Sequence, residues 1–594
     1  MKTLAVLSVI LCLLQGIILV DGGDFMDNSK PLQRMAREVG APAQVDCKLS
    51  TWSPWSKCDP CSKQMFRARS VEVFGQFGGQ TCFEPLGQKK ACTTDDACDR
   101  VQPECSETEF RCESGTCIKK RLECNGDNDC GDLSDEDCEE PHRPPCGKSL
   151  VDLSELGRTA GYGINILGSH PRANPFNNEF FNGVCNRVRD PSTREYNRIP
   201  WNVVALTYAT LTEESFSKDI FEEASTLVRE LLTEKSISVD AGFSFKFSGS
   251  PKEEGAASDT GGGFKGGVNV DSSEKIKTIN EYSTVKTKSF MRVKGKIQLS
   301  TFRMRSRDLR LSDTFLDDLI DLPLEYSKSR YFDFLEDYGT HYTVSGTAGG
   351  KYDLVYVMDK ETLKTSRMKE EEIKKCLGFD ASVDFKTSGV DLDLHAKPKF
   401  CNNLKTGSTA TNESTALLEK VISFVSGGTP ASTAALKRQI EKEGVMDVNA
   451  YVEWARSLDV APVLVTSKPE AIYNLVPLTM TDANKKKANL EAAINDYIEE
   501  YNVCKCKPCQ NGGTVTLIDG DCLCLCLPKF EGIAYQNRKS EAIDSGTVVQ
   551  EGNWACWSSW SACAGGHRTR SRICNTEGLS KGSCKGEQVK TDYC

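Results

Sequence analysis

The chain has 594 residues, with 74 basic and 84 acidic side chains and a formal net charge of −10. It contains no basic tract of the kind that follows nucleic-acid phosphates, so no nucleic-acid partner is expected. Its 28 cysteines crowd toward both ends and are missing from residues 186–375. Small domains that bury little apolar surface need covalent cross-links, whereas a long stretch can build its own core. We therefore expect one large domain flanked by disulfide-rich modules.

The amino terminus has the pattern of a secretory signal peptide over residues 1–22. Lys2 precedes an apolar run from Leu4 to Val20, which gives way to polar Asp21. Such a leader directs a chain to an oxidising compartment, where cysteines can pair. A signal anchor is the alternative, because the run nearly reaches the roughly 20 residues that cross a bilayer. No later segment is apolar over about 18 residues, so we expect a secreted, extracellular chain without a transmembrane helix.

Residues 44–99 form the first cysteine-rich module, with Cys47, Cys58, Cys61, Cys82, Cys92 and Cys98. Trp52 and Trp55 are followed by Arg67 and Arg69. This segment resembles a thrombospondin type 1 repeat, in which tryptophans and arginines stack alternately in place of a hydrophobic core. The resemblance implies the bonds Cys47–Cys82, Cys58–Cys61 and Cys92–Cys98. It also implies C-linked mannose on Trp52 and Trp55, and on Trp557 and Trp560 of a second repeat near the carboxyl terminus.

Residues 103–140 form the second module, with Cys105, Cys112, Cys117, Cys124, Cys130 and Cys138 around a run of acidic residues. This arrangement resembles a low-density-lipoprotein-receptor class A repeat. The resemblance implies the bonds Cys105–Cys117, Cys112–Cys130 and Cys124–Cys138, and a structural calcium ion, a hard cation that takes six or more oxygens. Its ligands would be the side chains of Asn125, Asp129, Asp135 and Glu136 and the main-chain carbonyls of Leu122 and Asp127. A solvated acidic loop is the alternative, whereas an EF-hand is excluded because its loop would contain Cys130 and lack the final glutamate.

Residues 141–503 have the composition of one globular domain. Apolar residues at helical spacing predict helices over 216–232 and around 490–501. Two other stretches alternate between apolar and polar residues, which is the pattern of β-strands. The first, which resumes more weakly over 268–293, has its apolar positions at Ile237, Val239, Ala241, Phe243, Phe245 and Phe247. The second has a turn at 386–389, with apolar positions at Phe379, Ala381, Val383, Phe385, Val390, Leu392 and Leu394.

This alternation has two physical explanations. An antiparallel sheet with one face on a core produces it. So does a membrane β-barrel, whose strands face lipid on one side and water on the other. The polar positions include Asp240, Lys246, Asp384 and Asp391, which suit a wet lumen. The pattern alone leaves both explanations open.

A signature of Tyr338, Gly339, Thr340, His341 and Tyr342 precedes Gly346, Gly349 and Gly350. With residues 159–166 and 200–203, it resembles the membrane-attack-complex/perforin (MACPF) family, in its terminal complement branch, over the whole central domain. The resemblance implies an α+β multidomain chain. Its MACPF domain would be a bent four-stranded antiparallel sheet with two helical clusters that convert to β-hairpins, flanked by small disulfide-rich modules. It also implies the bonds Cys146–Cys185 and Cys376–Cys401, and a hinge at Gly349 and Gly350.

The alternating segments fall where the helical clusters of this family belong, so we expect them to enter a membrane as hairpins. A chain drawn toward both helix and strand is locally frustrated and can hold two structures. One molecule would supply only four strands, and lipid tolerates no unpaired strand edge. Closing a barrel therefore needs many copies. The implied partners are the preceding terminal complement complex, further copies of this chain and the target lipid membrane, with no small-molecule substrate.

Three further features allow other interpretations. His341 could act as a catalytic base, but the chain has only 5 histidines and no H-E-x-x-H pair, so a structural role is favoured. Residues 261–266 fit the dinucleotide pattern G-x-G-x-x-G, which is weak without a strand before it and a helix after it, so a hairpin tip is expected. Asn412 is an N-glycan acceptor, which requires a surface loop.

Two more cysteine-rich segments end the chain. Residues 504–538 resemble an epidermal-growth-factor-like (EGF-like) module, which implies the bonds Cys506–Cys522 and Cys509–Cys524. Tyr535 stands where that family has its last cysteine, so Cys526 is either a free thiol or pairs in a rearranged tail. Residues 551–594 repeat the thrombospondin pattern, with tryptophans at 554, 557 and 560 and arginines at 568, 570 and 572. An odd number of cysteines accompanies this repeat, so one is expected to bridge outward, with Cys504 as a candidate.

These features favour a secreted pore-forming component of complement that polymerises on a target membrane and has no enzymatic activity. A single-copy subunit that joins the complex without self-polymerising is the first alternative, because the trailing repeat occurs in only some members of the branch. An adhesive extracellular matrix protein is the second, since thrombospondin and receptor-type modules serve adhesion elsewhere. A secreted hydrolase is disfavoured, because no nucleophile and base form a recognisable set.

Overall fold

A computed structural model of the chain describes residues 40–82, 84–98, 105–138, 144–147, 151–168, 170–191, 194–216, 224–235, 244–245, 268–282, 288–366, 372–373, 376–377, 384–386, 389–391, 417–511, 513–525, 530–538, 550–551, 553–558, 560–575, 582–584 and 586–594. The expected signal peptide, the glycan acceptor Asn412, and Cys401 and Cys526 lie outside these residues. Among the described helices, none combines the length and apolar character needed to cross a bilayer.

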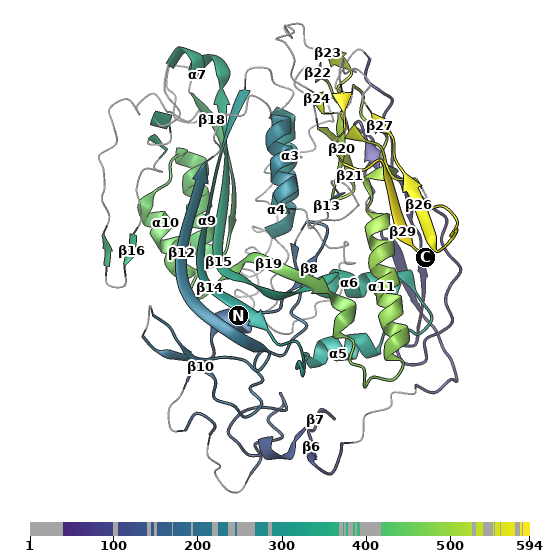
Figure 1. Cartoon of the computed structure of the whole chain (residues 1–594), viewed down its shortest axis with the longest axis vertical. Coiled ribbons are helices and arrows are strands. Elements are labelled where there is room, and N and C mark those ends of the chain that lie inside the picture. The colour runs from purple at the N-terminus through teal and green to yellow at the C-terminus, as the bar shows by residue number, and fades with distance from the viewer. Residues whose placement is uncertain are drawn as a thin grey trace, which may run out of the picture. The chain divides into compact units, whose positions relative to one another are not determined.

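A bent antiparallel sheet is the largest sheet among the described residues (Figure 1). Its long strands β12 (Val203–Phe216), β14 (Lys288–Met304) and β15 (His341–Asp359) pair in that order. Strand β15 then pairs with β18 (Leu418–Ser426) through residues 351–358 and with β19 (Val463–Ala471) through residues 341–349. Strands β18 and β19 together make the fourth strand, so the expected bent sheet is confirmed. Two short strands, β8 (Gly163–Asn165) and β9 (His170–Pro171), extend it.

The sheet bends along a row of irregular pairing. In β14 the register shifts between Gln298 and Ser300, opposite Gly349 and Ala348 of β15. Strand β12 has a shift in the same row, opposite the same two residues of β14, and β19 has one beside Ala348. Extra residues of this kind bend a strand and increase its twist. Because β15 changes its partner from β19 to β18 at this row, the bend divides the sheet into two halves.

Helices cover both faces of the half that carries β18. On one face, Leu354 and Tyr356 pack with α9 (Pro430–Glu443) and α10 (Val448–Ser457). On the other face, the alternate residues Val355 and Val357 pack with α3 (Ala224–Lys235) and α4 (Val268–Tyr282). The half that carries β19 packs on α5 (Asp313–Ile320), α6 (Lys328–Tyr338) and α11 (Ala483–Glu500). Strand residues thus alternate between two cores, as the two-residue period of a strand requires.

Both thrombospondin-type repeats contain the expected ladder of tryptophans and arginines. In the first, the Arg67 guanidinium lies 4.7 Å from the ring of Trp52 and 4.5 Å from that of Trp55, and Arg69 lies 4.3 Å from Trp52. In the second, arginines 568, 570 and 572 lie between 4.3 and 5.1 Å from the rings of tryptophans 554, 557 and 560. Stacked cations and rings therefore replace a conventional core in these modules.

Two of the expected disulfides in the first repeat are wrong. The structure joins Cys58 to Cys92 and Cys61 to Cys98, rather than Cys58 to Cys61 and Cys92 to Cys98, while Cys47–Cys82 is confirmed. The reason is the antiparallel pairing of β2 (Gln64–Ala68) with β5 (Gly87–Ala91). This pairing places the residues after β5 beside the residues before β2. Cys58 and Cys61, which precede β2, therefore bond to Cys92 and Cys98, which follow β5.

The remaining expected disulfides whose residues are described are present. They are Cys105–Cys117, Cys112–Cys130, Cys124–Cys138, Cys146–Cys185, Cys506–Cys522 and Cys509–Cys524. Cys376 is also bonded. Cys504 pairs with Cys556, which ties the second thrombospondin repeat to the EGF-like module and supplies the expected outward bridge. Two further bonds, Cys563–Cys594 and Cys574–Cys584, close that repeat.

The segment expected to be EGF-like contains a hairpin of β20 (Thr514–Ile518) and β21 (Asp521–Leu525), called the EGF-like hairpin below. Tyr535, which stands in the place of the missing cysteine, is 4 % exposed and donates its hydroxyl to the Cys524 carbonyl at 2.7 Å. A buried aromatic side chain with a satisfied hydroxyl thus stands where the expected EGF-like pattern has a cysteine.

One of the two helices expected from the sequence is confirmed, and the start of the other differs from the expectation. The helix near 490–501 is confirmed as α11. Of the helix expected over 216–232, the structure describes α3 from Ala224 onward, and residues 217–223 lie outside the described part of the chain. Phe216 instead ends β12, where it pairs with Val293 of β14. Pairing with a neighbouring strand therefore overrides the local helical spacing at this end.

The other elements are short. They are β1 (Lys48–Leu49), β3 (Val71–Val73), β4 (Gly75–Gln76), β6 (Glu109–Arg111), β7 (Cys117–Lys119), α2 (Glu155–Arg158), β10 (Arg187–Arg189), β11 (Tyr196–Arg198), β13 (Ser244–Phe245), α7 (Lys360–Ser366), β16 (Asp384–Lys386), β17 (Gly389–Asp391), β22 (Phe530–Glu531), β23 (Asn537–Arg538), β24 (Gln550–Glu551), β25 (Asn553–Trp554), β26 (His567–Ser571), β27 (Cys574–Asn575), β28 (Gly582–Ser583) and β29 (Val589–Tyr593), with single 3-10 turns at Lys120–Leu122, Ile472–Leu475 and Val503–Lys505.

Candidate functional site

Helices α3 and α4 lie on the face of the sheet opposite α9 and α10 (Figure 1). Their buried apolar residues include Leu227, Val228, Leu231 and Leu232 of α3 and Ile276 and Ile279 of α4, each 0 % exposed. The second helix falls in the stretch 268–293, where the sequence showed weak alternation. Its buried positions Ser273, Ile276 and Ile279 follow helical spacing, so this stretch can present one apolar face as a helix.

Helix α3 is also held on the sheet by ion pairs to Arg292 of β14. The Arg292 side chain is 3 % exposed and contacts Glu230 at 3.1 Å, Glu234 at 2.8 Å and Asp353 at 2.6 Å. Burial alone would lower the pKa of Arg292, but its hydrogen bonds to Asp353 and Glu234 raise it above the usual value. Glu230 and Glu234 belong to α3 and Asp353 to β15, so departure of α3 would leave this buried cation with fewer acidic partners, at a cost. The arginine therefore favours the state in which α3 stays on the sheet.

Helix α4 is held by two lysines. Lys275 Nζ donates to the main-chain carbonyl of Ser423 in β18 at 2.7 Å, and Ser423 Oγ donates to Glu441 of α9 at 2.6 Å. Lys277 forms an ion pair with Asp521 in the EGF-like hairpin. Ile518 and Leu525 of that hairpin belong to the same apolar core as the helices. The EGF-like module therefore takes part in holding α4 in place.

The alternating segments are described only in part. Ser244 and Phe245 form β13, which pairs in parallel with Leu517 and Ile518 of β20. The expected hairpin around 386–389 is present, with β16 and β17 paired from Asp384–Asp391 to Lys386–Gly389. The other expected membrane positions, Ile237, Val239, Ala241, Phe243, Phe247, Phe379, Ala381, Val383, Leu392 and Leu394, lie outside the described residues.

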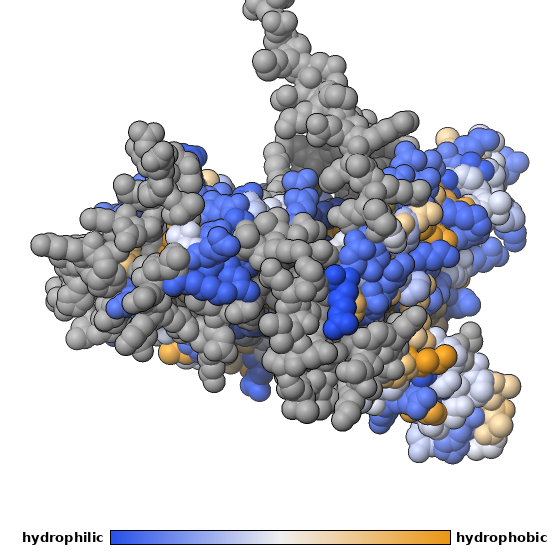
Figure 2. Space-filling model, turned by 90° about the horizontal axis from the view of Figure 1, so that it is seen from above, coloured by the Kyte–Doolittle hydropathy of each residue, from blue (hydrophilic) through white to orange (hydrophobic). Residues whose placement is uncertain are grey.

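Strand β12 forms one edge of the sheet, because among the described strands it pairs only with β14. Most of this strand is accessible, and Val204 and Leu211 are 45 % and 47 % exposed. In the view of Figure 2, most of the surface that is coloured by hydropathy is hydrophilic. An open edge is a template for another strand. It is the part of the sheet most suited to contact a second chain.

The signature residues form the junction between α6 and β15. Gly339 ends the helix with φ of +86°, and a Cβ there would lie 2.7 Å from Ile164 of β8. Thr340 is fully buried, and its Oγ1 accepts the Ile166 N–H at 2.9 Å. Tyr342 is 5 % exposed and packs edge-on against Phe176 at 5.5 Å. The signature therefore fixes the start of β15 beside β8, which is a structural task.

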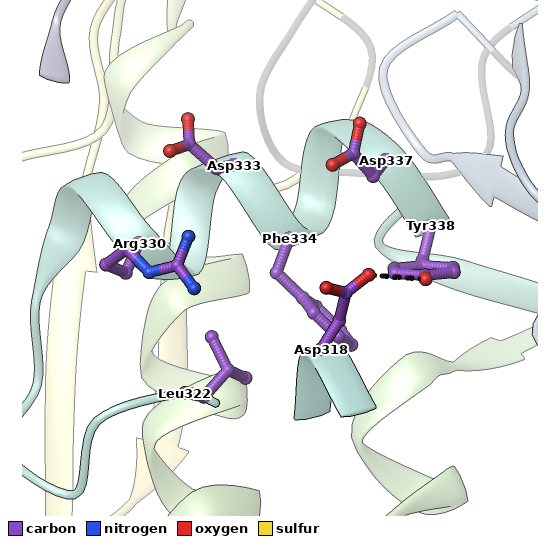
Figure 3. A pocket seen from close by; sticks show the side chains of 7 residues that line it. All are labelled: Asp318, Leu322, Arg330, Asp333, Phe334, Asp337 and Tyr338. Atoms are coloured by element: carbon purple, nitrogen blue, oxygen red, sulfur yellow. Dashed lines mark hydrogen bonds between the residues drawn. The ribbon is translucent and has the colours of Figure 1, made fainter. Parts of the chain in front are cut away.

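A small hollow lies between α5 and α6 at the end of the signature helix (Figure 3). Tyr338 donates its hydroxyl to Asp318 Oδ2 at 2.6 Å, whereas the carboxylates of Asp333 and Asp337 point away from Asp318. Burial, with the bond to Asp318 second, raises the pKa of Tyr338. The cavity of about 30 Å³ admits only one or two water molecules. Its acidic groups do not converge, so it offers no ligand site.

His341 Nδ1 lies 3.0 Å from Thr340 Oγ1, and burial lowers the pKa of the imidazole to about 4 from 6.5. The unfolded chain therefore takes up a proton that the folded chain refuses, so stability present above about pH 6.5 is lost as the pH falls toward 4. Thermal unfolding over this window would measure the loss. Between pH 6.5 and 4, the His341→Asn variant is expected to lose less stability than the wild type, because asparagine does not titrate. Equal losses would contradict a half-buried histidine that stays neutral in the folded chain.

Hydrogen bonds in the acidic loop of the receptor-type repeat link five of the six expected calcium ligands. Asn125 Nδ2 donates to Asp129 Oδ2 at 2.7 Å, and the Asp129 N–H donates to Asp135 Oδ2 at 2.8 Å. Glu136 accepts the main-chain N–H groups of Asn125 and of the next residue, both at 2.8 Å. The Asp127 carbonyl accepts the Asp129 N–H at 3.0 Å. Leu122, the sixth expected ligand, is 1 % exposed.

Two carboxylate oxygens of this loop fit a cation. Oδ1 of Asp129 and Oδ1 of Asp135 are buried and have no hydrogen-bond partner. Burial raises the pKa of Asp129 to about 6. Asp132 also lies near Asp135, but its carboxylate accepts Ser134 Oγ at 2.6 Å, and Cys130 is oxidised. Unpaired buried acceptors are expensive unless an ion meets them, so the donor set suits calcium.

Sequence reasoning did not single out the ion pairs that hold the helices. Arg292, Lys275 and Lys277 are ordinary charged residues in the sequence, and their partners are distant in the chain. Arg292 lies among apolar neighbours of β14, between Met291 and Val293, which is the one local sign of a buried charge.

Family models match most of the chain. The MAC/Perforin domain matches residues 156–507, the low-density lipoprotein receptor domain class A matches 103–140, and the thrombospondin type 1 domain matches 50–98 and 552–594.

Three complement proteins are similar over nearly the whole chain. Complement component C9 of Oncorhynchus mykiss is 51 % identical over 562 residues, which cover 93 % of this chain and 97 % of that protein. Complement component C6 of Bos taurus is 33 % identical over 93 % of this chain and 57 % of its own length. The complement component C8 alpha chain of Oryctolagus cuniculus is 29 % identical over 95 % of this chain and 96 % of its own length.

Proposed function

Since the chain belongs to the MAC/perforin family, we propose that it is a secreted pore-forming component of the terminal complement pathway, similar to complement component C9. It would bind the preceding terminal complex on a target membrane, polymerise and insert two β-hairpins from each copy. The identity of 51 % to a C9 protein, against 29 % to a C8 alpha chain, favours a polymerising component over a single-copy subunit.

The placement of α3 and α4 carries this proposal. Both helices pack on one face of the sheet, through a small apolar cluster, through ion pairs to β14 and the EGF-like hairpin, and through a hydrogen bond to a main-chain carbonyl of β18. These contacts involve side chains, so the helices can leave without breaking the backbone pairing of the sheet. The alternating sequence then lets the released segments form strands with one apolar and one polar face.

Self-association follows from the exposed edge. A hairpin in lipid must pair its outer edges, because each bare amide costs several kcal/mol there. Strand β12 offers one open edge, and β18 offers the other once Lys275 no longer caps Ser423. Gly349 and Gly350, which lie at the bend, would serve as the hinge when the sheet straightens. Copies would therefore join through opposite edges of the sheet.

We also assign a structural calcium ion to the receptor-type repeat. Asn125, Asp129, Asp135 and Glu136 would hold it with side-chain oxygens, and Leu122 and Asp127 with main-chain carbonyls. The support is the pair of unpartnered buried oxygens on Asp129 and Asp135. When bound, the ion supplies positive charge that offsets the repulsion among these carboxylates.

Release of a trapped fluorescent marker from liposomes tests the main proposal. Liposomes that carry the preceding terminal complex are expected to leak when the full chain is added, whereas liposomes without that complex should not. Electron microscopy of the same membranes should show rings. Binding without leakage would point to adhesion, and leakage without rings would point to a single-copy subunit, so either result would overturn the proposal.

A further inference from the structure

Asp127 of the acidic loop has two separate contacts. Its main-chain carbonyl faces inward, where it accepts the Asp129 N–H at 3.0 Å. Its carboxylate instead leaves the loop and meets Arg198 of the MACPF domain in a forked pair of hydrogen bonds, at 2.5 and 2.7 Å. Both side chains are nearly buried, with 10 % and 8 % exposed. One residue thus connects the expected calcium site to the large domain.

Arg198 is itself fixed on the side of the MACPF domain. Its guanidinium lies 3.9 Å from the ring of Phe181 and donates to the Val184 carbonyl at 3.0 Å. The bond Cys146–Cys185 closes the chain next to this contact. The planar guanidinium of arginine can stack on a ring and form two parallel hydrogen bonds to a carboxylate, whereas the ammonium group of lysine cannot do both. The geometry, and not only the charge, therefore matters at this position.

The rest of the interface also surrounds the expected ligands. The Leu122 side chain belongs to an apolar cluster with Phe180 of the MACPF domain. Arg121 donates to Asn182 Oδ1 at 2.9 Å. A Cβ at Gly183 would lie 2.9 Å from Leu122 Cδ2 and 3.5 Å from Asn125 Nδ2, so this loop touches the calcium loop closely.

The same contact leads to the sheet edge. Arg198 ends β11, and the chain turns through Trp201 into β12, which begins at Val203. The Trp201 N–H donates to the Phe180 carbonyl at 2.9 Å, and Arg305 stacks on its ring at 3.8 Å. A movement of the receptor-type repeat would therefore also move the start of β12, the open edge strand.

We propose that calcium in the receptor-type repeat controls the docking of that repeat on the MACPF domain, with Arg198 as the positioning residue, and so fixes the turn that leads into β12. This inference rests on the calcium site of the proposed function. Without the ion, the carboxylates of the loop repel one another and the Asp127 backbone is less constrained, so the forked pair with Arg198 weakens. Because linkage is reciprocal, a defect in docking must also weaken calcium binding.

Arg198→Lys tests this proposal with the full chain. The substitution keeps the positive charge, and with it the Coulomb effect on the ion, but removes the fork and the stacked ring. We expect calcium affinity, measured by isothermal titration calorimetry, to fall by about tenfold, as it does when outer residues of metal sites are changed. Arg568→Lys is the matched control, since Arg568 pairs with Asp592 at 2.6 Å in the distant second repeat, and its affinity should equal that of the wild type.

Hydrogen exchange of the wild type, with calcium and after chelation, provides the second readout. We expect chelation to speed exchange in 180–201 as well as in 105–138, and to leave 483–500 unchanged. Faster exchange confined to 105–138, or equal affinities of wild type and Arg198→Lys, would overturn the coupling while the calcium site stands. No binding heat with the wild type would overturn the calcium site itself, and the coupling with it.

Discussion

A disulfide between Ser244→Cys and Leu517→Cys is expected to abolish pore formation while membrane binding persists. These residues are Cα partners of the parallel pair β13–β20. Neighbouring strands lie about 4.8 Å apart, which is within the range that a disulfide spans. The bond would tether the first alternating segment to the EGF-like hairpin, so this segment could not extend into a membrane strand. Marker release from liposomes that carry the preceding complex is expected to fall to the level without protein, and cosedimentation to stay unchanged.

The matched control places the same number of cysteines within the EGF-like hairpin. Thr516 and Leu523 are Cα partners of β20 and β21, so Thr516→Cys with Leu523→Cys adds a disulfide that tethers no membrane segment. This variant should lyse like the wild type. Mild reduction should restore lysis by the tethered variant, with the wild type under the same reductant as reference. Full lysis by the oxidised, tethered variant would mean that the segment 236–247 need not leave its place, and the proposed mechanism would fail.

Gly349→Ala is expected to destabilise the MACPF domain by about 3 kcal/mol or more, at the top of the range for overpacked sites. A Cβ on Gly349 would lie 1.9 Å from the Ile297 carbonyl oxygen, in the row where the sheet bends. The obstacle is backbone, held by pairing on both sides, and it cannot turn aside as a side chain can. The melting temperature and the yield of folded chain would measure the loss.

Gly350→Ala provides the comparison one residue along the strand. There a Cβ would lie 2.5 Å from Leu458 Cδ2 and 2.8 Å from Trp454 Cζ2, so it meets side chains instead of backbone. Side chains in a core can shift at a cost of about 1–2 kcal/mol. We therefore expect the smaller loss at Gly350. Equal losses at the two positions would show that the bend does not depend on the close approach of β14 and β15.

The contacts that hold the helix pair explain how one domain can keep a stable sheet and still release segments from it. The sheet depends on long runs of paired backbone, with β14 joined to β15 from Lys288–Asp359 to Arg303–Ser345. The helices depend on side-chain packing and on charges such as Arg292 and Lys277. Ion pairs and side-chain packing can be separated without opening the paired backbone of the sheet, although the buried Arg292 would lose Glu230 and Glu234. In the proposed mechanism, release would therefore begin with the helices.

The sequence by itself determined the receptor-type and thrombospondin-type modules, the Trp–Arg ladders and the family of the central domain. These features depend on residue types at fixed local spacing, such as Trp52 with Trp55 or Asp135 with Glu136, and local spacing survives folding. The disulfides of the receptor-type repeat belong to the same class, because that family's cysteine pattern implied the bonds that the structure shows.

Other features required the folded chain. Cys58 meets Cys92 only because β2 and β5 pair in opposite directions. Phe216 becomes a strand residue because Val293 lies beside it, and Arg198 reaches Asp127 across 71 residues of sequence. Each of these contacts joins residues that are distant in the chain, and sequence spacing carries no information about which distant partners will meet. The bend in the sheet and the ion pairs that restrain its helices likewise depend on contacts between residues that are distant in the chain.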